Sequence, residues 1–436
     1  MRNVRIGVFV AAAHFAALLS APAAGSAQAP PACVPTLEGP IPATAASPAY
    51  HPPSAPPLPE GYVDEEYVIA CAALGSPYRT SLNVRRPAAP AGPAVLVVES
   101  THPSNIWPVL DFTHSYQTRA GHVAVAVNAN RSVVEARVKP SNAARYADLD
   151  VPGVEGMEEA ILAQLGAALR LGRLPGIQVG AVILGGYSFT GGVTRRYIEA
   201  HHVSARLEGG GPIYQGYFPN QTAVGTLPGP IPDLDVPVLE LQGEREILAT
   251  FARNPEGLGY RRADGALYRL YEVPGMAHIE TRGDVGPNEA CGIVKPSQFP
   301  MQHVWSVALR NLVEWIRDGE PALRAPRIEL EADGRTIARD ARGNAMGGVR
   351  TPYLDVPLAR YETVSERRAG ASGGARCDMV GAQLDLAPEE LRALYGSKEE
   401  YVARLGRRLD ALVADRWYLD FHARELLREA EASAPF

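Results

Sequence analysis

The sequence predicts an α/β fold in which a mainly parallel sheet carries helices on both faces. The first observation is a pair of apolar runs, "AVLVVES" at 94–100 and "HVAVAV" at 122–127, which are typical of strands buried on both faces. The second is that helical periods alternate with such runs, as in "MEEAILAQLGAALRLG" from Met157. The third is size, because 436 residues with 46% hydrophobic composition can bury a large core.

The chain begins with the features of an export signal. A basic start, "MRNVR", precedes the apolar stretch "IGVFVAAAHFAALLSA", and the small residues of "PAAGSAQA" suit cleavage near Ala27 or Ala29. We therefore expect residues 1–29 to be a signal peptide, and the mature protein to be periplasmic or secreted without membrane insertion. An uncleaved anchor is the alternative, although the apolar stretch is short for a membrane span.

Residues 30–60 are dominated by Pro, Ala and Ser, as in "PATAASPAYHPPSAPPLP". This composition cannot build a periodic core, so it predicts an extended, poorly ordered lead-in. A single folded domain is expected over 61–436, beginning with a half-exposed strand, "YRTSLNVRRP".

The four cysteines lack any Cys-x-x-Cys spacing, so they do not indicate a metal knuckle or a redox motif. In an oxidising compartment, two disulfides are the simplest expectation, and three pairings are possible. We favour Cys33 with Cys71 and Cys291 with Cys377, because each would hold one terminal extension against the fold.

Two long helices are predicted in the second half of the chain. "HVWSVALRNLVEWIRDG" from His303 ends at Gly319 and places four apolar side chains near one stripe, Val304, Val307, Leu312 and Trp315. A loop-rich and helical C-terminal extension follows over about 320–436. In it, Ser397 and Glu400 form a capping box before a helix whose apolar positions suit docking on the core, namely Tyr401, Leu405, Leu409 and Leu412.

The stretch "QVGAVILGGYSFTGGVTRRYIEAHH" predicts a strand, a tight turn and a helix, with Ser188 in the turn. This is the setting of a nucleophile elbow, in which a serine projects from a sterically open turn toward a base. Gly186 and Gly191 would let the backbone turn. The pattern is G-x-S-x-x-G, with Thr190 where G-x-S-x-G has glycine, so a phosphate-binding loop or a turn without function is the alternative.

Two later segments supply partners for Ser188. "LQGEREI" is the end of a strand followed by Glu246, and "YEVPGMAHIE" is a strand followed by a small-residue loop bearing His278. Serine, acid and histidine then follow each other in the chain order that is typical of enzymes with a nucleophile elbow, and each lies just beyond a strand end. Glu244 is the alternative acid, and Glu240 is expected to face outward from an alternating strand.

An oxyanion hole is expected from two loops. The amide of Phe189 begins the helix after Ser188, where the helix dipole favours negative charge. A second backbone amide is expected from "VVESTHPSNIWP", with Thr101 as first choice and Ser100 or His102 as alternatives. The side chains expected to line the substrate pocket are Tyr187, His102 and Trp107, although Trp107 could equally serve packing.

With these segments the chain resembles the "alpha/beta hydrolase domain" proteins of bacteria, an esterase-like group with exported members. The resemblance extends from "YRTSLNVRRP" to "LYGSKEEYVARLGRRLDALVADRWYL", and the loop "GNAMGGVRTPYLDVPLARY" at 343–361 carries it most specifically. It implies an α/β-hydrolase core with Ser188, Glu246 and His278 as nucleophile, acid and base. Family members commonly have Ser-Gln-Ser around the nucleophile and an asparagine in the early exit loop, whereas this chain has Phe189, Thr190 and His102. Arg350 in the 343–361 loop is a candidate for binding an acidic group near the active-site mouth.

These observations predict an exported serine hydrolase that cleaves small-molecule carboxylic esters through an acyl-enzyme. Amide or peptide cleavage and acyl transfer are alternatives on the same triad, and a non-catalytic envelope binding protein is the alternative of another class. No metal or organic cofactor is predicted. The sequence contains no HExxH motif, and its first predicted strand is not followed by a dinucleotide-binding G-x-G-x-x-G. The net charge of −6 with dispersed basic residues gives no footprint for nucleic acid. The oligomeric state is not predicted.

Overall fold

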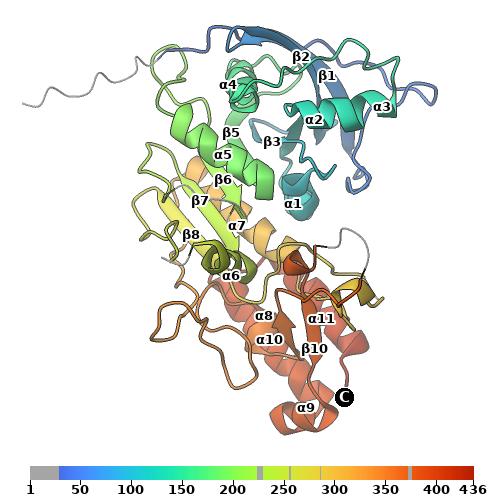
Figure 1. Cartoon of the computed structure of the whole chain (residues 1–436), viewed down its shortest axis with the longest axis vertical. Helices are drawn as coiled ribbons and strands as arrows, with labels where there is room; N and C mark the ends of the chain where they lie inside the picture. The colour runs from blue at the N-terminus through green and yellow to red at the C-terminus, as the bar shows by residue number, and fades with distance from the viewer. Residues whose placement is uncertain (1–28, 223–228, 255–256, 285, 372–375) are drawn as a thin grey trace, which may run out of the picture.

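The computed structural model describes residues 29–222, 229–254, 257–284, 286–371 and 376–436. Its centre is an eight-stranded sheet with the order β1-β2-β4-β3-β5-β6-β7-β8 (Figure 1). The strands pair antiparallel between β1, β2 and β4 and parallel from β4 to β8. Their bounds are β1 Tyr62–Ala73, β2 Ser76–Pro87, β3 Ala94–Ser100, β4 Val123–Val127, β5 Val179–Tyr187, β6 Gly216–Asn220, β7 Val238–Gly243 and β8 Tyr268–Val273. The predicted mainly parallel sheet is confirmed.

Helices cover both faces of this sheet. Helices α1 (Pro108–Arg119) and α7 (Met301–Asp318) pack on one face, and α4 (Met157–Arg170) and α5 (Ser188–Ala200) pack on the other (Figure 1). Along β3, Val95 and Val97 belong to the hydrophobic cluster that includes α1 and α7, whereas Leu96 and Val98 belong to the cluster that includes α4 and α5. Because successive side chains of a strand point to opposite faces, a sheet covered on both sides requires the unbroken apolar run that the sequence shows.

The remaining helices of this part are short. Helices α2 (Arg131–Val133) and α3 (Lys139–Ser141) are joined by a π-helical turn over Val134–Val138, and α6 (Glu244–Arg253) follows β7 directly. The predicted run 94–100 is β3 itself, and the helix predicted from His303 begins two residues earlier, directly after Pro300. Strands β1 and β6 were not predicted. β6 reads "GYFPN", and its five residues with one proline are too short for a period to show.

The lead-in is extended, as expected, but the expectation of poor order is wrong. Leu37 and Tyr50 are each only 5% exposed and belong to the hydrophobic core. Glu38 exchanges backbone hydrogen bonds with Val68 of β1 in both directions. The disulfide between Cys33 and Cys71 ties the same segment to β1, so a few buried anchors order a chain whose composition lacks any period.

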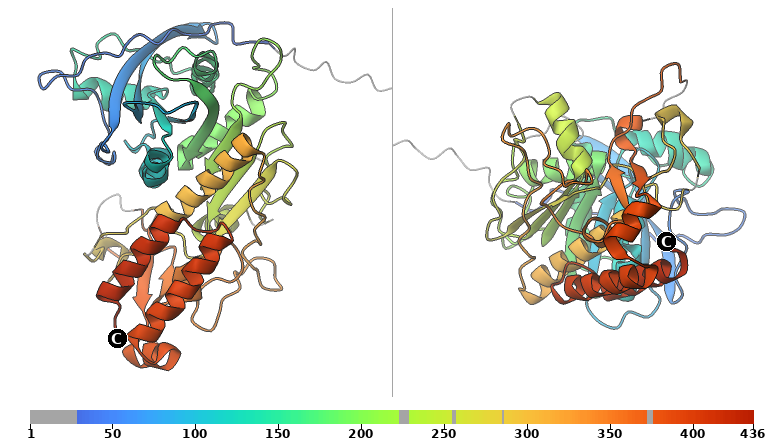
Figure 2. Two further views of the ribbon diagram at one scale, coloured as in Figure 1. Left: turned by 180° about the vertical axis from the view of Figure 1, so that it is seen from behind. Right: turned by 90° about the horizontal axis from the view of Figure 1, so that it is seen from below.

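The C-terminal extension forms a layer of its own. It contains α8 (Pro352–Asp355), a two-stranded sheet of β9 (Ala359–Glu362) and β10 (Ala382–Asp385), and helices α9 (Pro388–Tyr395), α10 (Lys398–Ala414) and α11 (Asp420–Ser433). Figure 2 shows α10 and α11 side by side beyond the end of α7. The disulfide between Cys291 and Cys377, the pairing we favoured, joins the loop after β8 to this layer, where each cysteine lies in a 3₁₀ turn, Glu289–Cys291 or Cys377–Met379.

The start of α10 confirms the expected cap, because Ser397 accepts a hydrogen bond from the backbone N–H of Glu400. The apolar stripe of α10 does not dock on the core as expected. Its residues Tyr401, Leu405, Leu409 and Leu412 join a separate hydrophobic cluster with Leu426 of α11. Helix α11 has an apolar face of its own, which packs against this stripe. Sequence periodicity shows that a helix has an apolar face, but it does not identify the surface that the face contacts.

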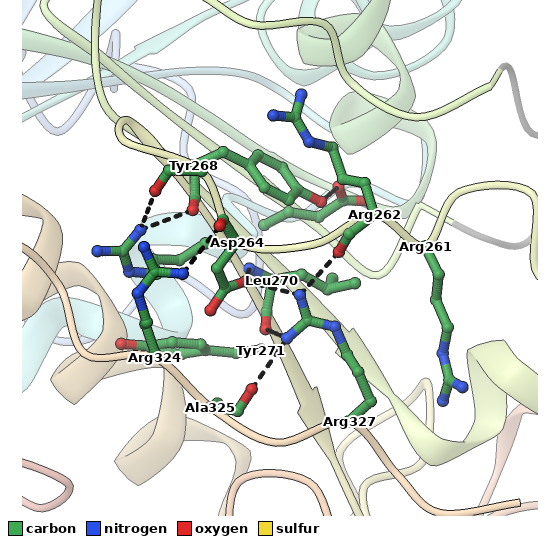
Figure 3. Close-up of polar contacts among 12 residues, drawn as sticks. Arg261, Arg262, Asp264, Tyr268, Leu270, Tyr271, Arg324, Ala325 and Arg327 are labelled. Carbon is green, nitrogen blue, oxygen red and sulfur yellow. Dashed lines mark hydrogen bonds and ion pairs between the residues drawn. The ribbon is translucent and has the colours of Figure 1, made fainter.

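An arginine network joins the first residues of the extension to the beginning of β8 (Figure 3). The Arg327 guanidinium donates to an Asp264 carboxylate oxygen at 2.6 Å and to the Leu270 carbonyl at 2.8 Å. Arg324 donates to the backbone carbonyl of Asp264 at 2.8 Å. Figure 3 also shows the neighbouring Arg261 and Arg262, which pair with Glu272 and Asp233 outside this cluster. The carboxylates offset the repulsion among these cations.

None of the helices in the described ranges is long and apolar enough to cross a membrane.

Trp305 of α7 gives a stability prediction. It is fully buried, with ring centroids 5.0 Å from Phe112, 5.8 Å from Tyr187 and 5.7 Å from Phe218. We expect Trp305→Ala to lower the free energy of unfolding by about 3–5 kcal/mol, because a large cavity opens among these rings. Urea unfolding measures this, with the exposed Leu171→Ala as control. A loss below about 1 kcal/mol would show that the site collapses around the gap.

Candidate active site

Ser188 lies at the junction of β5 and α5, as the elbow motif predicted. Its φ is +52°, a left-handed conformation that few residues other than glycine adopt. A Cβ on Gly186 would lie 2.2 Å from the Thr190 carbonyl oxygen, and a Cβ on Gly191 would lie 2.6 Å from the Asn220 carbonyl oxygen on β6. Both glycines therefore permit close backbone approach around the turn.

Thr190, which departs from the G-x-S-x-G pattern, supports the turn. The Thr190 hydroxyl accepts from the backbone N–H of Tyr187 at 3.1 Å and donates to the Tyr187 carbonyl at 3.0 Å. These bonds close the first turn of α5 across Ser188. The glycine that the common pattern places here is replaced by a side chain that caps the helix start.

The structure brings Ser188, His278 and Glu246 into one hydrogen-bonded chain. His278 Nε2 is 2.9 Å from Ser188 Oγ, and His278 Nδ1 is 2.6 Å from Glu246 Oε1. An ionised carboxylate only accepts, so His278 donates through Nδ1–H and its Nε2 lone pair faces the Ser188 hydroxyl. His278 is 2% exposed and Glu246 is fully buried, so water does not screen this pair.

Glu246 is held by donors on its second oxygen. Glu246 Oε2 accepts from the backbone N–H of Gly243 at 3.0 Å and from Gln221 Nε2 at 3.2 Å. Gln221 also donates to the Ala277 carbonyl at 2.9 Å, next to His278. A Cβ on Gly243 would lie 2.7 Å from Glu246 Oε2, which explains the glycine three residues before the acid.

Sequence reasoning did not find Gln221. It follows the short strand β6 that was not predicted, it is fully buried, and its φ of +47° is unusual for glutamine. The only available signal was a polar residue just past a strand end, and that strand could not be recognised.

The other two glutamates near Glu246 do not reach His278. Glu244 accepts from the backbone N–H of Gly275 at 2.8 Å and from Arg339 at 2.7 Å, so the structure favours Glu246 over this alternative. The expectation that Glu240 faces outward is wrong. It is fully buried and pairs with Arg195 at 2.9 Å, because β7 lies between β6 and β8 and both of its faces are covered.

Tyr187 supports the histidine rather than lining an open pocket. Its ring stacks on His278 with centroids 4.9 Å apart and an angle of 24° between planes. Its hydroxyl donates to the His278 carbonyl oxygen. Burial raises the pKa of Tyr187 well above its usual value, so the hydroxyl stays protonated and remains a donor.

The expectation that the β3 exit loop offers a backbone amide to the oxyanion is wrong. Thr101 N–H donates to the Val127 carbonyl at 2.9 Å, and His102 N–H donates to the Ile106 carbonyl at 3.1 Å. Ser100 belongs to the paired part of β3, opposite Val127. The amides of Thr101 and His102 are therefore already used by the sheet and by the turn that follows it.

Trp107 and His102 differ in their surroundings. Trp107 is 2% exposed, packs with Leu110 of α1, and donates through Nε1 to the Thr101 hydroxyl at 3.0 Å, so it is a packing residue and not a pocket wall. The His102 ring lies 5.9 Å from Tyr187 and 6.4 Å from Phe189, the two neighbours of Ser188 in the chain. His102 therefore lies beside the elbow.

Ser188 itself is half-buried, and the Phe189 side chain beside it is 44% exposed. A cavity of about 930 Å³ lies between α1, the loop after β8 and the C-terminal extension, with Phe112, Glu280 and Glu429 in its lining. Another of about 990 Å³ lies where α6 and the loop after β8 meet the extension, with Lys295 and Arg360 in its lining. Neither lining includes Ser188, so size alone does not identify the substrate pocket, and the hydrogen-bonded chain is the better guide.

Arg350 does not reach the site. Its guanidinium pairs with Asp355 at 2.8 Å and donates to the carbonyls of Ala345 and Leu354. The 343–361 loop thus uses this arginine to close on itself, which corrects the expectation that it binds an acidic ligand.

Within the part of the chain that the structure describes, one group of side chains has the composition of a metal site. His303, His422 and Glu425 place ligand atoms within 4.8 Å of one another between α7 and α11. His303 Nδ1 is 2.5 Å from the Tyr418 hydroxyl, and the Arg282 guanidinium donates to His303 Nε2 at 3.2 Å. Since both nitrogens of His303 are engaged, one of them by a cation, this arrangement serves as a polar contact between the two helices.

Glu99 in β3 supplies a pH prediction. It is buried and accepts from the backbone N–H groups of Val109 and Leu110 at the start of α1. Burial raises the pKa of Glu99 from 4.5 to about 8, and these two bonds oppose the shift. Between pH 4.5 and about pH 8, Glu99 keeps its proton in the folded protein but has lost it in the unfolded chain. The contribution of the neutral carboxyl to the free energy of unfolding is therefore fully present at low pH and is lost as the pH rises to about 8.

We therefore expect the unfolding free energy of wild type to fall, relative to Glu99→Gln, between about pH 5 and about pH 8.5. Urea titrations of both proteins at the two pH values measure this difference. A constant difference would mean that Glu99 is ionised in the fold.

Known proteins resemble this chain in sequence over most of its length and in structure over about half of it. The sequence model of a family described as "Alpha/beta hydrolase domain" matches residues 37–428. No curated protein matches the chain significantly. Among solved structures, a dienelactone hydrolase from Anabaena variabilis is 15% identical, with 49% of this chain and 88% of that chain covered and a TM-score of 0.31. An esterase from Pyrobaculum calidifontis is 12% identical, with 48% and 75% covered and a TM-score of 0.30. On the match that spans residues 37–428, this chain belongs to the alpha/beta hydrolase domain family.

Proposed function

We propose that this protein is a serine hydrolase that cleaves carboxylic esters through an acyl-enzyme. The observation that carries the proposal is the continuous hydrogen-bonded chain from Ser188 Oγ through His278 to Glu246. The family supports hydrolysis in general, and the preference for esters rests on how commonly this scaffold cleaves them.

Each side chain has a defined part in the reaction. Ser188 Oγ forms a bond to the carbonyl carbon of the substrate while its proton passes to His278 Nε2, and the carbonyl electron pair moves onto oxygen. Collapse restores the carbonyl and expels the alcohol, which takes the proton from His278. Water then attacks the acyl-enzyme in the same way and releases the acid. The Glu246 carboxylate keeps Nδ1 protonated and stabilises the imidazolium that forms between steps.

Export is part of the proposal. The signal peptide predicted over residues 1–29 lies outside the described residues except for its last residue, Ala29. Two disulfides support an oxidising destination, because such bonds persist mainly outside the cytosol. Mass spectrometry of the protein recovered from cell fractions tests this. A mature chain beginning near residue 28 or 30 in the periplasm or medium is expected, and full-length cytosolic protein contradicts it.

The activity is tested by labelling and by a substrate panel. A fluorophosphonate probe is expected to modify Ser188, identified by peptide mapping, and p-nitrophenyl esters are expected to be hydrolysed faster than matched anilides or peptides. Faster anilide or peptide cleavage would move the assignment to an amidase. Folded protein that neither labels at Ser188 nor turns over either class would overturn the proposal.

A further inference from the structure

The proposed acyl transfer creates an oxyanion, which such sites stabilise with two preorganised donors. The N–H of Phe189 is one candidate. Phe189 is the second residue of α5, so its N–H has no partner within the helix. The second donor is expected from the loop after β3, because β3 is the parallel neighbour of β5.

Close to the end of β3, every backbone N–H group of this loop already has an acceptor. Thr101, His102 and Asn105 donate their N–H groups to the carbonyls of Val127, Ile106 and His102. Pro103 has no N–H, and the N–H of Ser104 donates to His102 Nδ1 at 3.0 Å. Residues 101–105 therefore cannot supply the backbone amide that the sequence predicted.

The side chain of His102 offers a donor in the same loop. Since His102 Nδ1 accepts the Ser104 N–H, the proton of the neutral ring lies on Nε2. His102 is 7% exposed, and its Nε2 is buried without a hydrogen-bond partner. Leaving a buried N–H unpaired costs free energy, so a group held in this state indicates a partner that arrives with the substrate.

The position of this donor suits the oxyanion. The His102 ring centroid lies 5.9 Å from that of Tyr187 and 6.4 Å from that of Phe189, the two residues that flank Ser188 in the chain. A charge on His278 also lowers the pKa of His102, as expected for two rings at one site. Because Tyr187 also stacks on His278, the His102 ring lies beside both the nucleophile and the base.

We propose that His102 Nε2–H, together with the N–H of Phe189, forms the oxyanion hole of this enzyme. The inference rests on the proposed function. It makes His102 a catalytic residue, because its proton would contact the reacting oxygen. The loop thereby uses an imidazole where a backbone amide was expected.

The protonation state of His102 fits this role. Burial, and to a lesser extent His278, lowers the pKa of His102 to about 4. The ring is therefore neutral near pH 7, so it stabilises the oxyanion without placing a second cation beside the imidazolium. Nδ1 remains free to accept the Ser104 N–H, which fixes the direction of Nε2–H.

The test compares His102→Phe, which keeps the ring shape without a donor, with His102→Gln, which restores an N–H. With p-nitrophenyl butyrate we expect kcat to fall about 10²- to 10³-fold in His102→Phe at nearly unchanged KM, with part of the loss recovered in His102→Gln. The ratio of wild-type to His102→Phe kcat should stay constant from about pH 6 to about pH 9, because the ring is neutral throughout. The matched control is His122→Phe, since His122 is a buried histidine with a pKa near 4 that bonds to Tyr116, and its kcat should not change.

A second measurement separates the oxyanion from folding effects. Butylboronic acid forms a tetrahedral adduct on an active serine, and its affinity should fall in parallel with kcat/KM across the His102 variants. A kcat retained within about three-fold in His102→Phe, or a loss confined to KM, would overturn the inference while leaving the proposed function intact. Wild-type protein that neither hydrolyses esters nor labels at Ser188 would instead overturn the proposed function itself.

Discussion

Ser188→Ala is expected to lose about 10⁴- to 10⁶-fold in kcat against p-nitrophenyl esters while keeping its fold. The hydroxyl is the only atom removed, and it is the atom that His278 Nε2 contacts at 2.9 Å. Alanine has the smallest side chain after glycine, so it adds no clash at the left-handed backbone of this position. Initial rates with the purified variant, and its melting temperature, measure the two effects.

The matched control for this change is Ser204→Ala. Ser204 lies just past α5, where its hydroxyl donates to the Ala200 carbonyl far from His278. It should retain wild-type kcat and still react with the fluorophosphonate at Ser188. Full activity in Ser188→Ala would mean that another nucleophile performs the reaction.

Glu246→Gln is expected to lower kcat by about 10²- to 10⁴-fold. Two donors, the N–H of Gly243 and Gln221 Nε2, face one oxygen of this carboxylate, and His278 Nδ1 faces the other. A glutamine satisfies the two donors only by placing its carbonyl oxygen toward them, which turns its NH₂ toward His278. The imidazole must then carry its proton on Nε2, where it can no longer accept the proton of Ser188.

Glu244→Gln separates this effect from the general loss of a buried carboxylate. Glu244 is 1% exposed and bonds to Gly275 and Arg339, so its replacement should lower stability but leave kcat within about three-fold. Steady-state kinetics of the two variants at one pH, with melting temperatures for both, decide between the acids. A larger kcat loss in Glu244→Gln than in Glu246→Gln would assign the acid to Glu244.

Local patterns carried much of the prediction. The apolar run 94–100 is a strand because both of its faces need cover, and the order strand, glycine turn, helix around Ser188 depends on neighbours within a few residues. His278 and Glu246 were placed by the rule that side chains just past parallel strand ends meet at one edge of the sheet. Each of these signals lies within a single element and its adjoining loop.

The residues that escaped prediction depend on partners distant in the chain. Gln221 binds Glu246 and the Ala277 carbonyl, contacts that span 25 and 56 residues. The wrong outcome for Glu240 has the same origin, since its burial depends on Arg195 and on two flanking strands.

The sequence by itself determined the α/β class, the elbow at Ser188 and the histidine that completes it, because hydrophobic period and glycine placement act over short stretches of chain. Only the tertiary structure decided which donors of the β3 exit loop remain free, which carboxylate contacts the imidazole, and which surface the α10 stripe covers. The physical reason is that each hydrogen-bonding group and each apolar face is used by whichever partner the whole fold brings nearest, and that competition has no local signature.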